Sequence, residues 1–121
     1  MGAHQISGLI DKRAALRERI KQLAGQFLQR CSQDAGSFRD LLARLRADDA
    51  NVFKEIEYLA HRTSGTGASL GFESLSTCAA AIERLAEAHK GTSTPDRTVT
   101  ERLAEYIALL EKEVELLVTM Q

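Results

Sequence analysis

Residues 60–72, AHRTSGTGASLGF, combine one histidine with three glycines and a cluster of hydroxyl side chains. These residue types serve phosphate chemistry in two ways. A glycine-rich loop binds a phosphate through backbone N–H groups, whereas a histidine can carry a phosphoryl group covalently. The stretch lacks the lysine of a GxxxxGK[ST] loop, and no strand pattern precedes it. These missing features argue against a phosphate-binding loop and leave the role of His61 open at this point.

His61 falls on the outer face of the helix that its segment predicts. At about 100° per residue, the core-type positions fall within an arc of about 80°, and His61 lies about 160° from its centre. The core-type positions are Val52, Ile56, Leu59, Thr63, Gly67 and Leu70, and the face of His61 carries Lys54, Glu57, Ser64, Gly65 and Ala68. Because glycine inside a helix costs about 1 kcal/mol relative to alanine, an outward Gly65 indicates that a partner approaches closely there.

Helical periodicity covers nearly the whole chain, and no segment alternates apolar and polar residues with period two. The fold class is therefore all-α. Apolar residues three and four apart predict helices over residues 52–70, 72–85 and 99–117. Gly71 can end the first of these helices, and the stretch GTSTP at 91–95 predicts a loop between the other two.

The N-terminal third is expected to be divided into separate helices. Apolar positions over residues 6–31 predict one or two helices, because Gly25 is a candidate for a bend or break. Residues 32–34 offer a cap for a short helix over 38–45, and Asp49 can cap the helix that follows.

Short connections between amphipathic helices favour antiparallel neighbours. The expected architecture is an antiparallel four-helix bundle with an additional N-terminal helical segment, in a single domain over residues 1–121. Residues 1–5 are expected to be a flexible tail or a cloning remnant, and His4 is given no role. A closed bundle with a polar last helix favours a monomer.

Composition restricts the classes of partner. The formal net charge is −1, from 16 basic and 17 acidic residues, so no basic field draws the chain to nucleic acid or anionic lipid. No run is long and apolar enough to span a membrane, and no signal peptide is visible at the start. Cys31 and Cys78 lie in apolar segments, which is typical of reduced thiols in a cytoplasmic protein.

The stretch around His61 resembles the motif of the histidine-containing phosphotransfer (HPt) domains of phosphorelays. The similarity covers residues 35–90 in detail and the remainder only as a helix pattern. The matching residues are Ala60, His61, Arg62, Gly65, Thr66, Gly67, Leu70 and Gly71, followed by Leu75, Cys78, Ile82 and Glu83, and preceded by an acidic Asp48 or Asp49.

The resemblance implies a phosphorelay intermediate. His61 would accept a phosphoryl group from an aspartyl phosphate on a receiver domain, or from a histidine kinase pathway, and pass it to another response-regulator receiver. The implied partners are such receivers and a hybrid histidine kinase. The receiver would supply Mg²⁺, so the chain would need no cofactor or metal of its own and would have no ATP-dependent kinase activity. An ungapped alignment gives Glu83 the role of holding the other imidazole nitrogen.

Two positions depart from the family pattern. Thr63 stands where an apolar residue is usual, and Ser64 stands where a lysine is usual. An ammonium group one turn from the phosphohistidine would stabilise its negative charge, and Ser64 supplies no charge. Lys54 or Arg62 could partly replace it.

The missing lysine leaves a second hypothesis open, a helical docking module that binds a receiver domain without phosphotransfer. A third is the phosphoacceptor domain of a larger histidine kinase. His89 is better explained by its place near a helix C-terminus, where the dipole favours a cation. No spacing of His, Cys or acidic residues supports a metal site, and no nucleophile elbow is present.

Overall fold

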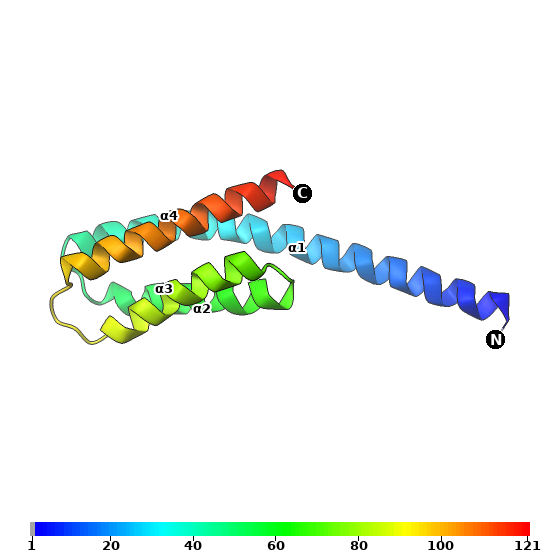
Figure 1. The fold of residues 1–121 in the computed structure, drawn as a ribbon, viewed down its shortest axis with the longest axis horizontal. Coiled ribbons are helices and arrows are strands. Elements are labelled where there is room, and N and C mark those ends of the chain that lie inside the picture. Colours follow the sequence, from blue (N-terminus) through cyan, green and yellow to red (C-terminus); the bar gives the residue numbers. More distant parts are fainter. Residues whose placement is uncertain (1) are drawn as a thin grey trace.

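The computed structural model describes residues 2–121, the side chain of His4 excepted (Figure 1). It is all-helical, and no strand occurs within the described range, which confirms the predicted class. The helices are α1 (Ala3–Arg46), α2 (Val52–Ser69), α3 (Glu73–His89) and α4 (Arg97–Thr119).

The four helices alternate in direction along the chain and pack in a ring (Figure 1). α2 packs against α3, α3 against α4, α4 against α1, and α1 against α2. The N-terminal half of α1 continues past the ends of the other helices, so the N-terminus lies far from the bundle (Figure 1). Phe27 is the first buried residue of α1 among those described.

Apolar side chains from all four helices fill the space inside the ring. Phe27 of α1 stacks on Phe72, with ring centroids 5.9 Å apart, and this pair closes the core beside the α2–α3 turn. The largest fully buried side chains are Phe38, Phe53, Leu28, Leu45, Ile56, Leu75, Ile82, Leu103, Ile107, Val52 and Thr63.

The predicted division of the N-terminal third is wrong, because α1 is one continuous helix of 44 residues. Gly25 lies within it without ending it, and the expected cap at residues 32–34 is helix interior. The Ser32 hydroxyl donates to the Leu28 carbonyl oxygen at 3.2 Å, and Asp34 accepts bonds from Arg62 of α2. Both polar groups are satisfied without breaking the helix.

The expected tail over residues 1–5 also differs, since α1 begins at Ala3; Met1 lies outside the described residues. The extra N-terminal helical segment is thus an extension of α1. Despite its length, neither α1 nor any other helix in the described range has a stretch long and apolar enough to cross a membrane.

The turns that position α2 follow local backbone chemistry. Asn51, rather than Asp49, is the N-cap of α2; Asp49 accepts a bond from the Asn51 N–H and pairs with Arg44 instead. At the other end Gly71 has φ +85°, the left-handed conformation that glycine adopts without strain, as its predicted stop role requires. The Phe72 N–H donates back to the Gly67 carbonyl at 2.8 Å, so α3 folds directly against α2.

Candidate functional site

His61 projects from the middle of α2 with 75% of its side chain exposed. The core-facing side of the same helix is filled by Ile56, Ala60 and Thr63, all buried. This is the outward placement that the helical periodicity predicts. The imidazole is therefore held by a buried helix and is open to a partner.

Glu83 of α3 fixes the orientation of the imidazole. Its carboxylate oxygen Oε2 lies 2.5 Å from His61 Nδ1, and its side chain is only 22% exposed. Because a carboxylate accepts hydrogen bonds, Nδ1 carries the proton in this pair, and in the neutral imidazole Nε2 then keeps its lone pair. The structure thus brings together the two residues that the HPt resemblance pairs.

Small residues allow α2 and α3 to come close enough for this contact. A β-carbon at Gly67 would lie 3.5 Å from the Ser76 β-carbon, so the two backbones meet at this level. The Ser76 hydroxyl donates to the Ser64 carbonyl at 2.8 Å, and the two hydroxyls are 3.4 Å apart. Ser64 is thus half-buried against α3, so it contributes to the helix contact.

Gly65 and Ala68 leave the surface beside His61 bare. Both residues are exposed, and a β-carbon added at Gly65 would meet no atom within 4 Å. Packing within the chain therefore gives no reason for glycine at position 65. The open space favours the interpretation that another molecule approaches the backbone here.

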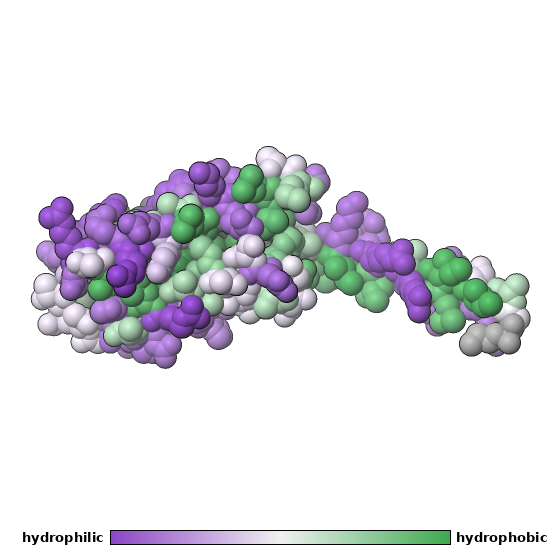
Figure 2. Space-filling view, in the orientation of Figure 1, coloured by the Kyte–Doolittle hydropathy of each residue, from purple (hydrophilic) through white to green (hydrophobic). Residues whose placement is uncertain are grey.

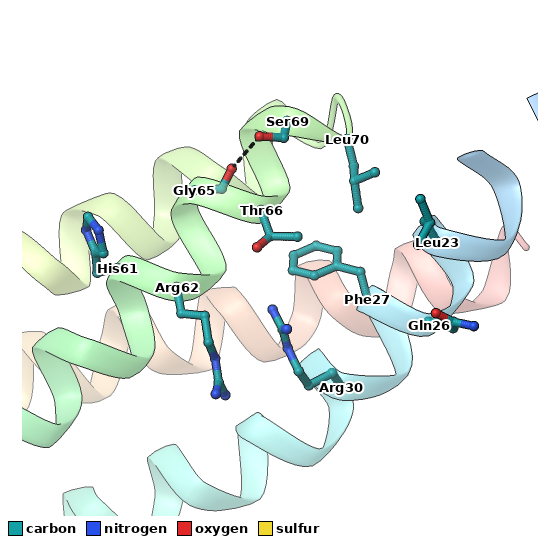
Figure 3. Close-up of a pocket in the computed structure, with 10 residues that line it drawn as sticks. All are labelled: Leu23, Gln26, Phe27, Arg30, His61, Arg62, Gly65, Thr66, Ser69 and Leu70. Atoms are coloured by element: carbon teal, nitrogen blue, oxygen red, sulfur yellow. Dashed lines mark hydrogen bonds between the residues drawn. The ribbon is translucent and has the colours of Figure 1, made fainter. Parts of the chain in front are cut away.

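Arg62 points away from the imidazole, toward α1 (Figure 3). One of its nitrogens donates to both carboxylate oxygens of Asp34, each at 3.1 Å, and its guanidinium lies over the Tyr58 ring at 5.9 Å. Asp34 is buried, with Arg30 also 4.0 Å from its carboxylate. Arg62 is consequently a residue of the α1–α2 contact, and its position does not suit it to replace the missing lysine.

Lys54 remains the better placed cation. It lines a hollow between α2 and α3 together with His61, Glu83, Glu57 and Lys90. Lys90 pairs with Glu57 at 3.1 Å, whereas Lys54 makes no ion pair within the described range. A flexible ammonium group two turns before His61 is therefore available to a negative charge near the imidazole.

A second hollow lies on the other side of His61, between α1 and α2 (Figure 3). Apolar atoms dominate its surface, and its lining includes Phe27 and Leu70 together with Arg30 and Arg62. The sequence predicts none of the α1 residues of this hollow as site residues: Leu23, Gln26, Phe27 and Arg30. Their only sequence signal is their three-to-four spacing, which is the same whether they face the core or a hollow.

The remaining candidates lie away from His61. His89 ends α3 and packs near the Phe53 ring, with ring centroids 6.2 Å apart. Cys31 and Cys78 are free thiols. Burial, and next the neighbouring Asp34, raises the pKa of the Cys31 thiol to about 11, so this thiol stays protonated at neutral pH and acts as core filling.

Comparison with known families agrees with this geometry. The family model described as Hpt domain matches residues 22–118, which include all of α2, α3 and the packed part of α1. No curated protein and no solved structure matches the chain significantly.

Proposed function

The chain belongs to the Hpt domain family, whose members act in phosphorelay signalling together with response-regulator receivers, and from this premise we propose that His61 is its phosphoacceptor. The observation that carries the proposal is the contact between His61 Nδ1 and Glu83, which leaves Nε2 exposed. Holding the proton on Nδ1 gives Nε2 the lone pair that a nucleophile needs.

The transfer step follows from this tautomer. Nε2 attacks the phosphorus of an aspartyl phosphate, the N–P bond forms, and the P–O bond to the aspartate breaks with the electron pair leaving on the carboxylate. The ring gains positive charge, which Glu83 stabilises through Nδ1–H. The reverse step passes the group to another receiver. The receiver is expected to supply Mg²⁺, so this chain contributes the nucleophile and its position.

The surface around His61 suits a domain-sized partner. The bare backbone at Gly65 and the exposed Ala68 permit close approach, and the apolar hollow beside them offers contact area. A receiver that docks there would bring its aspartate to Nε2. We assign a receiver of a hybrid histidine kinase as donor and a response regulator as acceptor.

Lys54 takes part of the role of the lysine that Ser64 replaces. A phosphorylated His61 would carry close to two negative charges beside a hollow to which Lys54 contributes the unpaired ammonium group. Because that group is about two turns away, we expect weaker stabilisation and slower transfer than a lysine at position 64 would give.

The working unit in this proposal is the antiparallel four-helix bundle within the matched residues 22–118, acting as a monomer in the cytoplasm. It includes His61, Glu83 and both hollows, and its core is complete without the projecting part of α1.

Transfer of labelled phosphate tests the proposal directly. Receiver domains loaded with labelled phosphate are mixed with the wild-type chain, with His61→Gln and with Ser64→Lys. We expect acid-labile label on the wild type, none on His61→Gln, and label that appears about tenfold faster or more on Ser64→Lys, because an added ion pair of roughly 1.4 kcal/mol gives tenfold. Receivers that bind wild type and His61→Gln equally, without label on either, would instead establish the docking module.

A further inference from the structure

The projecting part of α1 carries large apolar side chains that no other described part of the chain covers (Figure 2). Every residue from Gln5 to Leu23 is exposed, and residues 3–21 precede the Hpt match. The apolar residues, with their exposed fractions, are Ile6 49%, Leu9 49%, Ile10 61%, Leu16 59%, Ile20 46% and Leu23 37%. A helix in water gains most of its stability by packing an apolar face, so this face indicates a partner.

The spacing of these residues defines the shape of the partner. Positions 6, 9, 13, 16, 20 and 23 alternate steps of three and four, which is the heptad spacing of a coiled-coil seam. Arg13 is the one charged residue in this series. Ile10 lies roughly 90° from the centre of this series and widens the apolar face on one side. The heptad spacing of the series fits one partner helix.

The charged residues beside the seam indicate which charges the partner helix carries. At about 100° per residue, Lys12, Arg17 and Arg19 lie roughly 70–90° from the centre of the seam, where a partner helix passes. Asp11 and Glu18 lie roughly 170° from it, on the far side of α1. Both flanks therefore carry basic residues and no acidic one, with Ile10 on the side of Arg17, although the whole chain has a net charge of −1.

These flanks disfavour pairing with a second copy of α1. In a parallel pair Lys12 would face Arg17 of the other copy, and in an antiparallel pair the flank with Lys12 and Arg19 would face the same flank of the other copy. The two acidic residues, on the far side, cannot relieve either contact. Acidic flanks on a different helix would turn each of these positions into an ion pair.

We propose that residues 6–23 form a two-stranded coiled coil with an acidic amphipathic helix of a partner protein, one with Leu or Ile in a heptad seam and Glu or Asp on both flanks. This interaction is separate from phosphotransfer at His61. It would hold the bundle beside the protein to which that helix belongs.

A synthetic peptide pair tests the proposal on the full chain. Both labelled peptides have three heptads with leucine in the seam; one carries glutamate on its flanks, and the other carries lysine. We expect the acidic peptide to bind at least tenfold more tightly by fluorescence anisotropy, with binding that weakens as salt rises. Equal binding of both peptides, or binding of neither, would overturn the proposal.

Matched variants separate the seam from its charges. Leu16→Asn should weaken binding of the acidic peptide at least tenfold, whereas Leu109→Asn on α4, equally exposed at 59%, should leave it unchanged. The triple change Lys12→Glu, Arg17→Glu and Arg19→Glu should reverse the preference toward the basic peptide. Circular dichroism checks that each variant folds.

Two further measurements give results that contradict the proposal. A dimer in sedimentation that Leu16→Asn abolishes would show that a second copy covers the seam. Tighter binding to phosphatidylserine vesicles than to the acidic peptide, lost in Leu16→Asn, would show that a lipid surface does. Labelled-phosphate transfer to His61 is measured in parallel, so failure of the coiled coil is distinguished from failure of phosphotransfer.

Discussion

At the scale of single residues, the site depends on a contact between positions 22 apart in the chain, His61 and Glu83. The outward placement of His61 follows from periodicity alone, because a residue opposite the apolar stripe of a packed helix faces solvent. The pairing with Glu83 needed the family resemblance, since periodicity does not tell which residues of two helices meet.

We predict that Glu83→Ala slows phosphoryl acceptance about tenfold. A charge-assisted hydrogen bond contributes about 1.5–3 kcal/mol, and exposure of the imidazole reduces this to roughly 1.4 kcal/mol, or tenfold in rate. Glu83→Gln keeps an acceptor for Nδ1–H but not the charge, so its loss should be about threefold. Rates of labelled-phosphate transfer from a receiver measure both.

Glu87→Ala is the matched control for this prediction. Glu87 lines the same hollow as His61 and Glu83 but makes no bond to the imidazole. The Glu87→Ala variant should accept the phosphoryl group at the wild-type rate. An equal loss in Glu87→Ala would assign the effect to the general negative charge of the hollow, and wild-type transfer in Glu83→Ala would contradict the role of Glu83.

At the scale of helices, the sequence predicts α2, α3 and α4 because each has one apolar stripe. It also predicts the loop before α4, because glycine and proline mark the ends of the neighbouring helices. The break expected at residues 32–34 is absent because Ser32 bonds the carbonyl one turn back within the helix, and Asp34 has a partner that the local sequence does not reveal. Asp34 looks like a helix cap in sequence, but its partner Arg62 is 28 positions away. Tertiary contacts overrode the local signal.

We predict opposite consequences for the two glycines of α2. Gly65→Ala should stabilise the fold by about 1 kcal/mol, since alanine is the better helix former and space is open at this position. It should nevertheless weaken receiver binding, because the new methyl group covers the bare backbone beside His61. Urea unfolding and receiver titration measure the two effects on the same protein.

Gly67→Ala provides the comparison within the same helix. Its β-carbon would make ordinary contact with Ser76 at 3.5 Å on the side facing α3, so the fold should tolerate it. Receiver binding should not change, because Gly67 is buried and faces α3 rather than the partner. If Gly65→Ala binds receivers as well as Gly67→Ala does, close backbone approach is not the reason for glycine at position 65.

At the scale of the whole molecule, α1 has two parts in different surroundings, one packed in the bundle and one projecting from it. From Phe27 onward α1 faces the core, whereas the apolar residues before it face solvent although they follow the same three-to-four spacing. Sequence periodicity alone could not distinguish these two parts. A helix has the same apolar spacing whether it packs on the core of its own chain or on another molecule.

We therefore predict that removing residues 1–21 leaves the bundle intact. No core residue precedes Phe27 among those described, so the free energy of unfolding should change by about 1 kcal/mol or less. Helical circular dichroism should fall by the share of the deleted residues, while transfer to His61 stays at the wild-type rate and binding of the acidic peptide is lost.

A truncated chain that unfolds in much lower urea would show instead that the projecting helix stabilises the bundle. Loss of transfer in a chain that still folds would show that a receiver docks on that helix as well, joining the two regions in one function.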